Sequence, residues 1–147
     1  MKAWPEFNEH GDLPLGVHSA TLDEAVQHFG TTTRREVIAR RLERIYQLAR
    51  STGHLAHFIV FGSFVTAKAE PNDVDIFLLM EDSFDVRQVS TEARLVFDHA
   101  AAQNLLGASV FWIRRAAALG GEDATTAHWQ IKRDGTKRGI LEIIDHD

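Results

Sequence analysis

Two short apolar runs, residues 55–61 (LAHFIVF) and residues 74–80 (VDIFLLM), constrain the fold of this chain most strongly. Both have the length of a β-strand, and neither alternates cleanly between apolar and polar side chains. We therefore expect each run to be a central strand that is buried in a sheet. Residues 62–73 between them contain a glycine, a proline and an asparagine, which favour a loop.

Helical patterns surround these two runs. A capping box at Thr21 predicts a short helix that ends near Gly30. Residues 33–52 carry apolar side chains at helical spacing and predict a long helix. A third helix is expected at about residues 92–104, where alanine, valine and phenylalanine recur on one side. The helices and strands alternate along the chain, as they do when helices pack on a single sheet.

The rest of the chain completes one domain. Further strands are expected at residues 109–113 and at residues 139–144. The expected organisation is an irregular N-terminal arm (residues 1–20), a core (residues 21–114) and a tail that ends in a strand (residues 115–147). The predicted fold class is α/β or α+β, with a small mixed sheet and helices packed on it.

Composition excludes several classes of function. The formal net charge of −5 argues against a generally basic nucleic-acid binder, so a contact with RNA would need a local basic surface. The absence of cysteine excludes a disulfide framework and a cysteine nucleophile. No apolar run approaches the ~18 residues of a membrane helix, and the first residues do not form a secretory signal. We expect a cytoplasmic protein with no membrane contact.

Four residues around the loop carry the chemistry. Gly62 follows a predicted buried strand and can turn sharply beside a ligand, while Ser63 offers a hydroxyl and an N–H to a phosphate. Asp73 and Asp75 lie two positions apart at the start of the next strand, so both side chains point to one sheet face. Two unpaired carboxylates this close repel each other. A divalent cation such as Mg²⁺, which prefers oxygen ligands, would relieve that repulsion.

Residues 60–80 (VFGSFVTAKAEPNDVDIFLLM) resemble the signature of the polymerase-β-like (minimal) nucleotidyltransferases. The resemblance implies that Gly62 and Ser63 bind the triphosphate and that Asp73 and Asp75 are catalytic ligands of Mg²⁺ or Mn²⁺. It implies an enzyme that transfers a nucleoside monophosphate from a nucleoside triphosphate to a hydroxyl, releasing pyrophosphate. The acceptor would be an RNA end, a protein or a small molecule.

Two further residues of this loop, Thr66 and Lys68, are candidates for phosphate binding. Thr66 would add a hydroxyl to the phosphate site or simply form a turn. Lys68 would neutralise phosphate charge or be a solvated loop lysine.

The whole chain also resembles a small bacterial family of stand-alone domains of this kind. Small members of the superfamily often occur in toxin–antitoxin or defence pairs, which implies an antitoxin-like protein partner. The segments that carry this closer likeness are LPLGVHSATLDE, FGSFVTAKAEPNDVDIFLL and WQIKRDGTKRGILEI.

The chain departs from the superfamily at one position. Active members usually place a third carboxylate on the next strand, where this chain has Ser109. Glu142 and Asp98 are possible substitutes that the sequence does not place. The alternative function is therefore a catalytically inactive binding module for a nucleotide or a protein partner.

Basic and aromatic residues outside the motif allow two interpretations each. Arginines of residues 33–52 would hold an acidic acceptor such as RNA or form a solvated face, and the second is favoured because glutamates are interspersed. The pairs Lys132-Arg133 and Lys137-Arg138 allow the same two interpretations. Trp112 and Trp129 are expected to be core or interface aromatics rather than platforms for a base.

Overall fold

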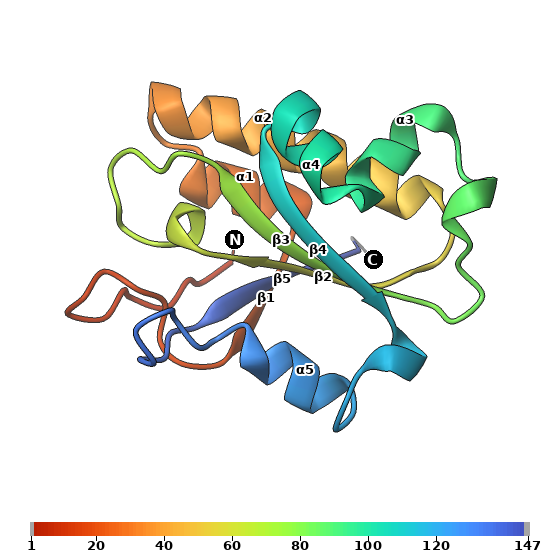
Figure 1. Cartoon of the computed structure of the whole chain (residues 1–147). Helices are drawn as coiled ribbons and strands as arrows, with labels where there is room; N and C mark the ends of the chain where they lie inside the picture. The colour runs from red at the N-terminus through yellow and green to blue at the C-terminus, as the bar shows by residue number, and fades with distance from the viewer. Residues whose placement is uncertain (1, 146–147) are drawn as a thin grey trace.

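A five-stranded mixed sheet forms the centre of the computed structural model, which describes residues 2–145 (Figure 1). The strand order is β1-β5-β2-β3-β4. The pairs β1–β5 and β3–β4 are parallel, whereas β2 is antiparallel to both β3 and β5. This arrangement confirms the prediction of a small mixed sheet with helices packed on it. The strands are β1 (Val17–Thr21), β2 (Leu55–Phe61), β3 (Val74–Met80), β4 (Ala108–Arg114) and β5 (Ile140–Ile144).

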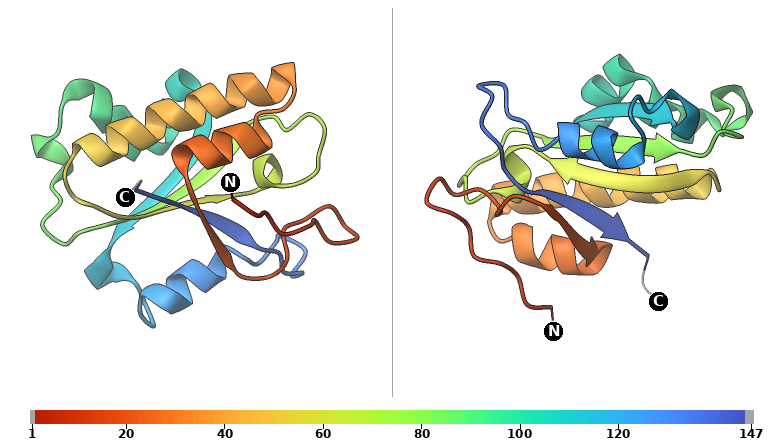
Figure 2. Two further views of the ribbon diagram at one scale, coloured as in Figure 1. Left: turned by 180° about the vertical axis from the view of Figure 1, so that it is seen from behind. Right: turned by 90° about the horizontal axis from the view of Figure 1, so that it is seen from below.

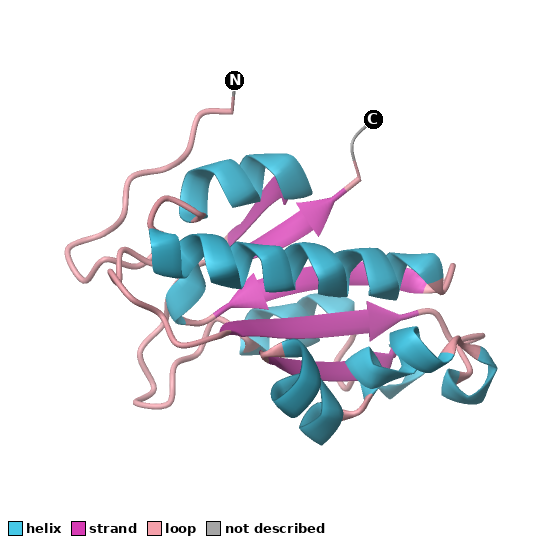
Figure 3. Cartoon of the chain, turned by 90° about the horizontal axis from the view of Figure 1, so that it is seen from above, coloured by secondary structure: helices cyan, strands magenta, loops and turns pink. Residues whose placement is uncertain are grey.

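Helices cover the two faces of this sheet unequally. Four helices lie on one face, and the longest of them, α2, runs across the sheet above its strands (Figures 1 and 3). Of the α-helices among residues 2–145, α5 lies on the other face, as the view from below shows (Figure 2). We call these the helix face and the α5 face. The helices are α1 (Leu22–Phe29), α2 (Thr33–Ser51), α3 (Thr91–Arg94), α4 (His99–Ala101) and α5 (Glu122–His128).

Side chains of β3 alternate between the two faces, as the two-residue period of a strand requires. The even-numbered positions join the main core under α1 and α2 and are fully buried: Val74, Ile76, Leu78 and Met80. Phe77 and Leu79 point the other way, into a small second cluster that Trp129 helps to cover. Asp75 therefore lies on the α5 face, at the end where β3 begins.

Several predicted boundaries are confirmed. Strands β2 and β3 match residues 55–61 and 74–80, and α2 ends at Ser51, with Thr52 as its C-cap. The capping box of α1 is formed in full: the Glu24 N–H donates to Thr21 Oγ1 at 3.2 Å, and the Thr21 N–H donates to Glu24 Oε1 at 2.9 Å.

Two predictions are wrong in part. Residues 17–20 of the expected irregular arm, together with Thr21, form β1, because they pair in parallel with β5 from the far end of the chain. The helix expected at residues 92–104 is broken at Asp98, whose backbone is extended and whose side chain accepts the N–H of Ala101 to begin α4. A 3₁₀ turn (Leu95–Phe97) precedes the break, and a π-helical turn (Ala102–Leu106) follows α4.

Three other short 3₁₀ turns connect the elements, at Ser63–Val65, Val86–Gln88 and Arg115–Ala117. Helix α5 lies in the tail, between the strands expected at residues 109–113 and 139–144, where the sequence predicts no particular element. Within residues 2–145, no helix is both long enough and apolar enough to cross a membrane.

Candidate functional site

The turn at Gly62 brings the Gly-Ser motif against the acidic pair. Gly62 ends β2 with φ 79° and ψ −167°, a region of backbone conformation that is almost restricted to glycine. A Cβ built at this position would lie 1.9 Å from Asp75 Oδ2. The carboxylate of Asp75 therefore occupies the space that any other side chain would need. The predicted phosphate-binding turn and the predicted metal ligand are thus in direct contact.

Two arginines of α2 hold the loop that follows this turn. Arg35 is buried, and its guanidinium donates to the carbonyl oxygens of Phe64 at 2.7 Å and Thr66 at 2.6 Å. Arg34 donates to the carbonyl oxygens of Pro71 and Asn72 just before the acidic pair. These two arginines therefore neither form a solvated face nor point to an acceptor, because the loop carbonyls use their N–H groups.

Thr66 and Lys68 lie in the same loop. The Thr66 hydroxyl donates to the Ser63 carbonyl at 2.7 Å and accepts the Lys68 N–H at 3.1 Å. These bonds are those of a turn, the second of the two roles expected for Thr66. Lys68 is exposed, and its carbonyl oxygen is bound by Arg35. Neither residue lines the cleft described below, and of the four motif residues only Asp75 lines it. Ser63 is half-buried directly beside Gly62.

Asp73, Asp75 and Ser109 meet where β3 and β4 begin. Asp75 lies opposite Phe61 of β2 and in register with Ser109 of β4. The Ser109 hydroxyl donates to Asp73 Oδ2 at 3.0 Å. Burial raises the pKa of Asp75 to about 6, with a further contribution from the charge of Asp73, while Arg138 and Arg133 act in the opposite direction. The carboxylates are thus close enough to interact strongly.

A cleft of about 390 Å³ opens over Asp75 on the α5 face. Its walls combine acidic, cationic and aromatic side chains that lie far apart in the sequence. Lys132, Arg133 and Arg138 come from the turn before β5, and aromatic rings come from β2, β4 and the end of α5. The principal lining residues are Phe61, Asp75, Ser109, Phe111, Trp129, Lys132, Arg133 and Arg138.

The sequence missed most of the residues that surround the acids. Trp129 is expected to be a core or interface aromatic, yet it lines the cleft as well as covering the second cluster. Phe111 and Ser109 share a face of β4 by the strand period, which was the available signal for Phe111. Lys132 and Arg138 reach the cleft only because their turn leads into β5, and both also approach Asp12, at 3.3 and 3.7 Å. That long-range arrangement leaves no local pattern in the sequence.

Neither possible substitute for a third carboxylate lies with the acidic pair. Glu142 is on β5, with β2 between it and β3, and its Oε2 is 2.5 Å from His57 Nδ1. Asp98 is exposed and caps α4. Across residues 2–145, no group of three or more histidine, aspartate or glutamate side chains is arranged to hold a metal ion. Ser109 therefore occupies the third position with a neutral hydroxyl.

The two carboxylates nevertheless suit a divalent cation that also binds a substrate. Mg²⁺ is commonly held by one or two carboxylates, with phosphate oxygens and water completing its shell. Burial, and then the neighbouring Asp73, raise the pKa of Asp75 because both disfavour its charged form. Two carboxylates on one sheet face are a donor set that fits Mg²⁺ or Mn²⁺.

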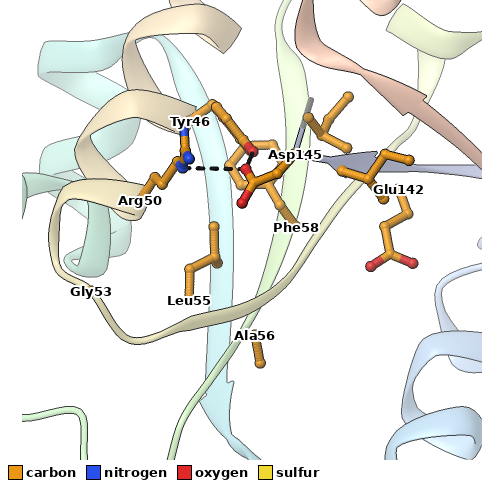
Figure 4. Close-up of a pocket in the computed structure, with 10 residues that line it drawn as sticks. Tyr46, Arg50, Gly53, Leu55, Ala56, Phe58, Glu142 and Asp145 are labelled. Atoms are coloured by element: carbon orange, nitrogen blue, oxygen red, sulfur yellow. Dashed lines mark hydrogen bonds and ion pairs between the residues drawn. The ribbon is translucent and has the colours of Figure 1, made fainter. Parts of the chain in front are cut away.

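A second hollow of about 380 Å³ lies between the end of α2 and β5 (Figure 4). Here the Tyr46 hydroxyl donates to Asp145 Oδ1 at 2.7 Å, and Arg50 Nε lies 3.2 Å from the same atom. Burial and Asp145 raise the pKa of Tyr46 to about 12. The side chain of Glu142 turns away from this group (Figure 4). The charged side chains of Arg50 and Asp145 in this hollow pair with each other, so the cleft over Asp75 is the better candidate site.

Comparison with known proteins identifies a family. The chain belongs to the family described as "Family of unknown function (DUF6932)", whose profile matches residues 5–144. No curated protein and no solved structure gives a significant match to the chain.

Proposed function

We propose that this chain is a Mg²⁺- or Mn²⁺-dependent nucleotidyltransferase with a polymerase-β-like core, acting in the cleft over Asp75. The observation that carries the proposal is the contact between the Gly62 turn and the Asp75 carboxylate, where a Cβ would lie 1.9 Å from Oδ2. A turn whose backbone N–H groups would receive phosphate oxygens and an acid that suits a metal are thereby in contact. This pairing is what binding a metal–triphosphate complex requires.

Each residue of the site has a role in this proposal. Asp73 and Asp75 would hold the metal, which when bound neutralises phosphate charge and favours attack by a hydroxyl. The Gly62-Ser63 turn would receive phosphate oxygens. Ser109 would orient Asp73 through its hydrogen bond of 3.0 Å.

The charge of the cleft supports a polyphosphate ligand. Three cationic side chains, Lys132, Arg133 and Arg138, line it with one acid, Asp75, and two of the three also lie near the buried Asp12. An arginine fork also matches the geometry of phosphate oxygens. The overall acidity of the chain, −5, does not exclude an anionic substrate, because cationic side chains gather locally around Asp75.

The proposed transfer balances as a displacement at phosphorus. The acceptor hydroxyl oxygen bonds to the α-phosphorus, and the bond from that phosphorus to the bridging oxygen breaks. Pyrophosphate leaves with the electron pair, and the hydroxyl proton passes to solvent. The acceptor is an RNA end, a protein or a small molecule, and an antitoxin-like protein partner stays a prediction.

The test uses the purified full chain with each α-labelled nucleoside triphosphate, Mg²⁺ or Mn²⁺, and a lysate that supplies RNA and protein. Label should appear in an acceptor and should fall to background in Asp73→Ala and Asp75→Ala. Glu70→Ala, which removes an exposed acid from the same loop, is the matched control and should keep full transfer. Transfer that persists in both aspartate variants would contradict the assignment of the site.

A binding module that has lost transfer is the second candidate, and Ser109 is the observation that favours it. A serine is neutral and a weak Mg²⁺ ligand, and here its hydroxyl is already bonded to Asp73. If the wild type binds a metal–nucleotide complex without transferring label, Ser109→Asp should create transfer. Transfer by the wild type would leave this second candidate without support.

A further inference from the structure

Four aromatic rings form a continuous surface beside the acidic pair. Trp129, at the end of α5, lies at their centre: its ring centroid is 4.6 Å from that of Phe61, 5.0 Å from Phe77 and 5.2 Å from Phe111. Phe77 is buried by this packing, but Phe111 keeps 40% of its surface exposed. Phe61 and Trp129 are half-buried, so Phe111 is the most exposed ring of the cluster and the others support it.

Phe111 stands at the border of two hollows. One is the cleft over Asp75, and the other, also about 390 Å³, continues along β4 and is lined mainly by aromatic and apolar residues. Both hollows include Phe111, Trp129 and His99. A polar, cationic compartment and an apolar, aromatic compartment thus meet at these three rings, of which Phe111 belongs to the strand that carries Ser109.

The geometry of β4 sets the distance between Ser109, which lies beside Asp75, and Phe111, which lies at the border of the two hollows. Ser109, in register with Asp75, lies two positions before Phe111 on the same face of β4. Two residues of a strand span roughly 6.6 Å. That spacing is comparable to the length of a ribose, which separates the α-phosphate of a nucleotide from its base.

We propose that Phe111, supported by Trp129, is the platform on which the base of the bound nucleoside triphosphate stacks. The phosphates then point toward Asp75, Arg133 and Arg138. This inference rests on the proposed function, because it places the base of the same ligand. Base–aromatic stacking is strong and tolerates any base, since every base has a π-face. The proposal also reverses the expectation that Trp129 has no part in a base platform.

Two side chains at the rim fix and complete the platform. The ring of His99 lies 5.0 Å from that of Phe111, and its Nδ1 is 3.1 Å from the Val110 carbonyl oxygen, so the imidazole is held beside the platform. Gln103, in the π-helical turn after α4, lines the cleft and carries an amide that both donates and accepts. Gln103 is therefore placed to read the polar edge of a stacked base.

The experiment compares nucleotides with a ligand that has phosphates but no base. Affinities of the full chain for ATP, GTP, CTP, UTP and inorganic tripolyphosphate are measured by calorimetry with Mg²⁺. Phe111→Ala should weaken the nucleoside triphosphates roughly 5- to 100-fold and leave tripolyphosphate within twofold of wild type. Phe111→Trp should restore nucleotide affinity. Asp75→Ala should weaken both kinds of ligand.

Two control variants separate the loss of stacking from a general effect of the substitution. Phe111→Leu keeps apolar volume without an aromatic face, and it should lose nucleotide affinity as Phe111→Ala does, even if the smaller alanine disturbs packing. Leu119→Ala removes an apolar side chain that is 90% exposed and lines neither hollow, and should change nothing. The circular dichroism spectrum and melting temperature of each variant establish that it is folded.

The outcomes separate the two proposals. If Phe111→Ala and Phe111→Leu bind nucleotides like the wild type while Asp75→Ala does not, the platform is refuted and the proposed function stands. Equal weakening of tripolyphosphate by Phe111→Ala would also refute the platform. If the wild type binds neither nucleotides nor tripolyphosphate, the proposed function and the platform both fail.

Discussion

The two faces of strand β3 differ in what they do, although they belong to the same seven residues. On the helix face, Ile76 and Leu78 are fully buried beneath α2. On the α5 face, Asp75 is only partly buried, because α5 is short and leaves this end of the strand open. Because neighbouring residues of a strand point to opposite faces, Ile76 packs in the core while Asp75, one residue away, belongs to the candidate site.

The helices on the two faces are also held to the sheet by different interactions. Helix α2 packs through an apolar stripe of fully buried residues such as Ile38, Leu42 and Ile45. Helix α5 is attached by Trp129 and by Glu122, whose Oε1 lies 3.3 Å from His57 Nε2 and 3.2 Å from Arg115 Nε. Ion pairs as exposed as these stabilise little. The α5 face is therefore the side from which we expect local opening, as is usual for a ligand-binding side.

The largest expected effect comes from Gly62→Ala, at the turn that follows β2 and contacts Asp75. The new Cβ clashes with Asp75 Oδ2 and the backbone keeps an unfavourable φ of 79°, so we expect a loss of about 3–4 kcal/mol in unfolding free energy. Urea denaturation measures it. Adding Asp75→Ala removes the clash but not the backbone cost, so the double variant should regain part of the loss. Strict additivity of the two changes would contradict the contact.

Arg35→Ala should be the next most damaging change. Its guanidinium satisfies the carbonyl oxygens of the Gly62–Lys68 loop from the helix face, and removing it leaves buried acceptors unpaired. We expect a loss of about 3 kcal/mol, read from chemical denaturation. Arg34→Ala, which acts at the more exposed end of the loop, is the control and should cost about 1 kcal/mol. Equal losses would show that burial does not decide the effect.

The sequence predicted the features that depend on local residue patterns or on neighbouring strands. The runs at residues 55–61 and 74–80 predict their strands because an uninterrupted apolar run fixes both length and burial. The resemblance to the superfamily implies that Ser109 lies beside the acids, and Ser109 is in register with Asp75. These features depend on local sequence or on neighbouring strands.

The rest depends on contacts between distant segments, which leave no local pattern. Strand β1 exists because residues 17–21 pair with residues 140–144. The break at Asp98 arises because an N-cap side chain competes with helix continuation, in a segment whose apolar period predicts one helix. The cationic wall of the cleft forms because the turn before β5 passes over the start of β3.

A smaller effect of opposite sign is expected for Asp75→Asn in chelator-treated protein. The pKa of Asp75 is about 6 in the folded chain against 3.8 for the ordinary group, so the folded state binds its proton more tightly than the unfolded state. The folded wild type is therefore penalised above pH 6, and this penalty disappears as the pH falls to about 4. Asp75→Asn should add about 1 kcal/mol at pH 7.5, a value reduced for partial exposure, and nothing near pH 4.

The matched variant for this prediction lies one residue away on the helix face. Ile76→Ala should lose about 3 kcal/mol at every pH, because it opens a cavity and changes no charge. Unfolding free energies of wild type and both variants, measured between pH 4 and pH 8, give the comparison. A pH-independent effect of Asp75→Asn would refute the view that its carboxylate is destabilising.

The smallest effect is expected for Trp129→Phe on the α5 face. The Trp129 indole Nε1 is buried and has no hydrogen-bond partner among the described residues, so phenylalanine removes an unpaired donor while keeping an aromatic ring. The unfolding free energy should therefore change by no more than about 0.5 kcal/mol. Trp129→Ala, which removes the ring that links Phe61, Phe77 and Phe111, should lose about 2–3 kcal/mol. If Trp129→Ala loses no more than Trp129→Phe, the packing of this ring on Phe61, Phe77 and Phe111 does not hold α5 on the sheet.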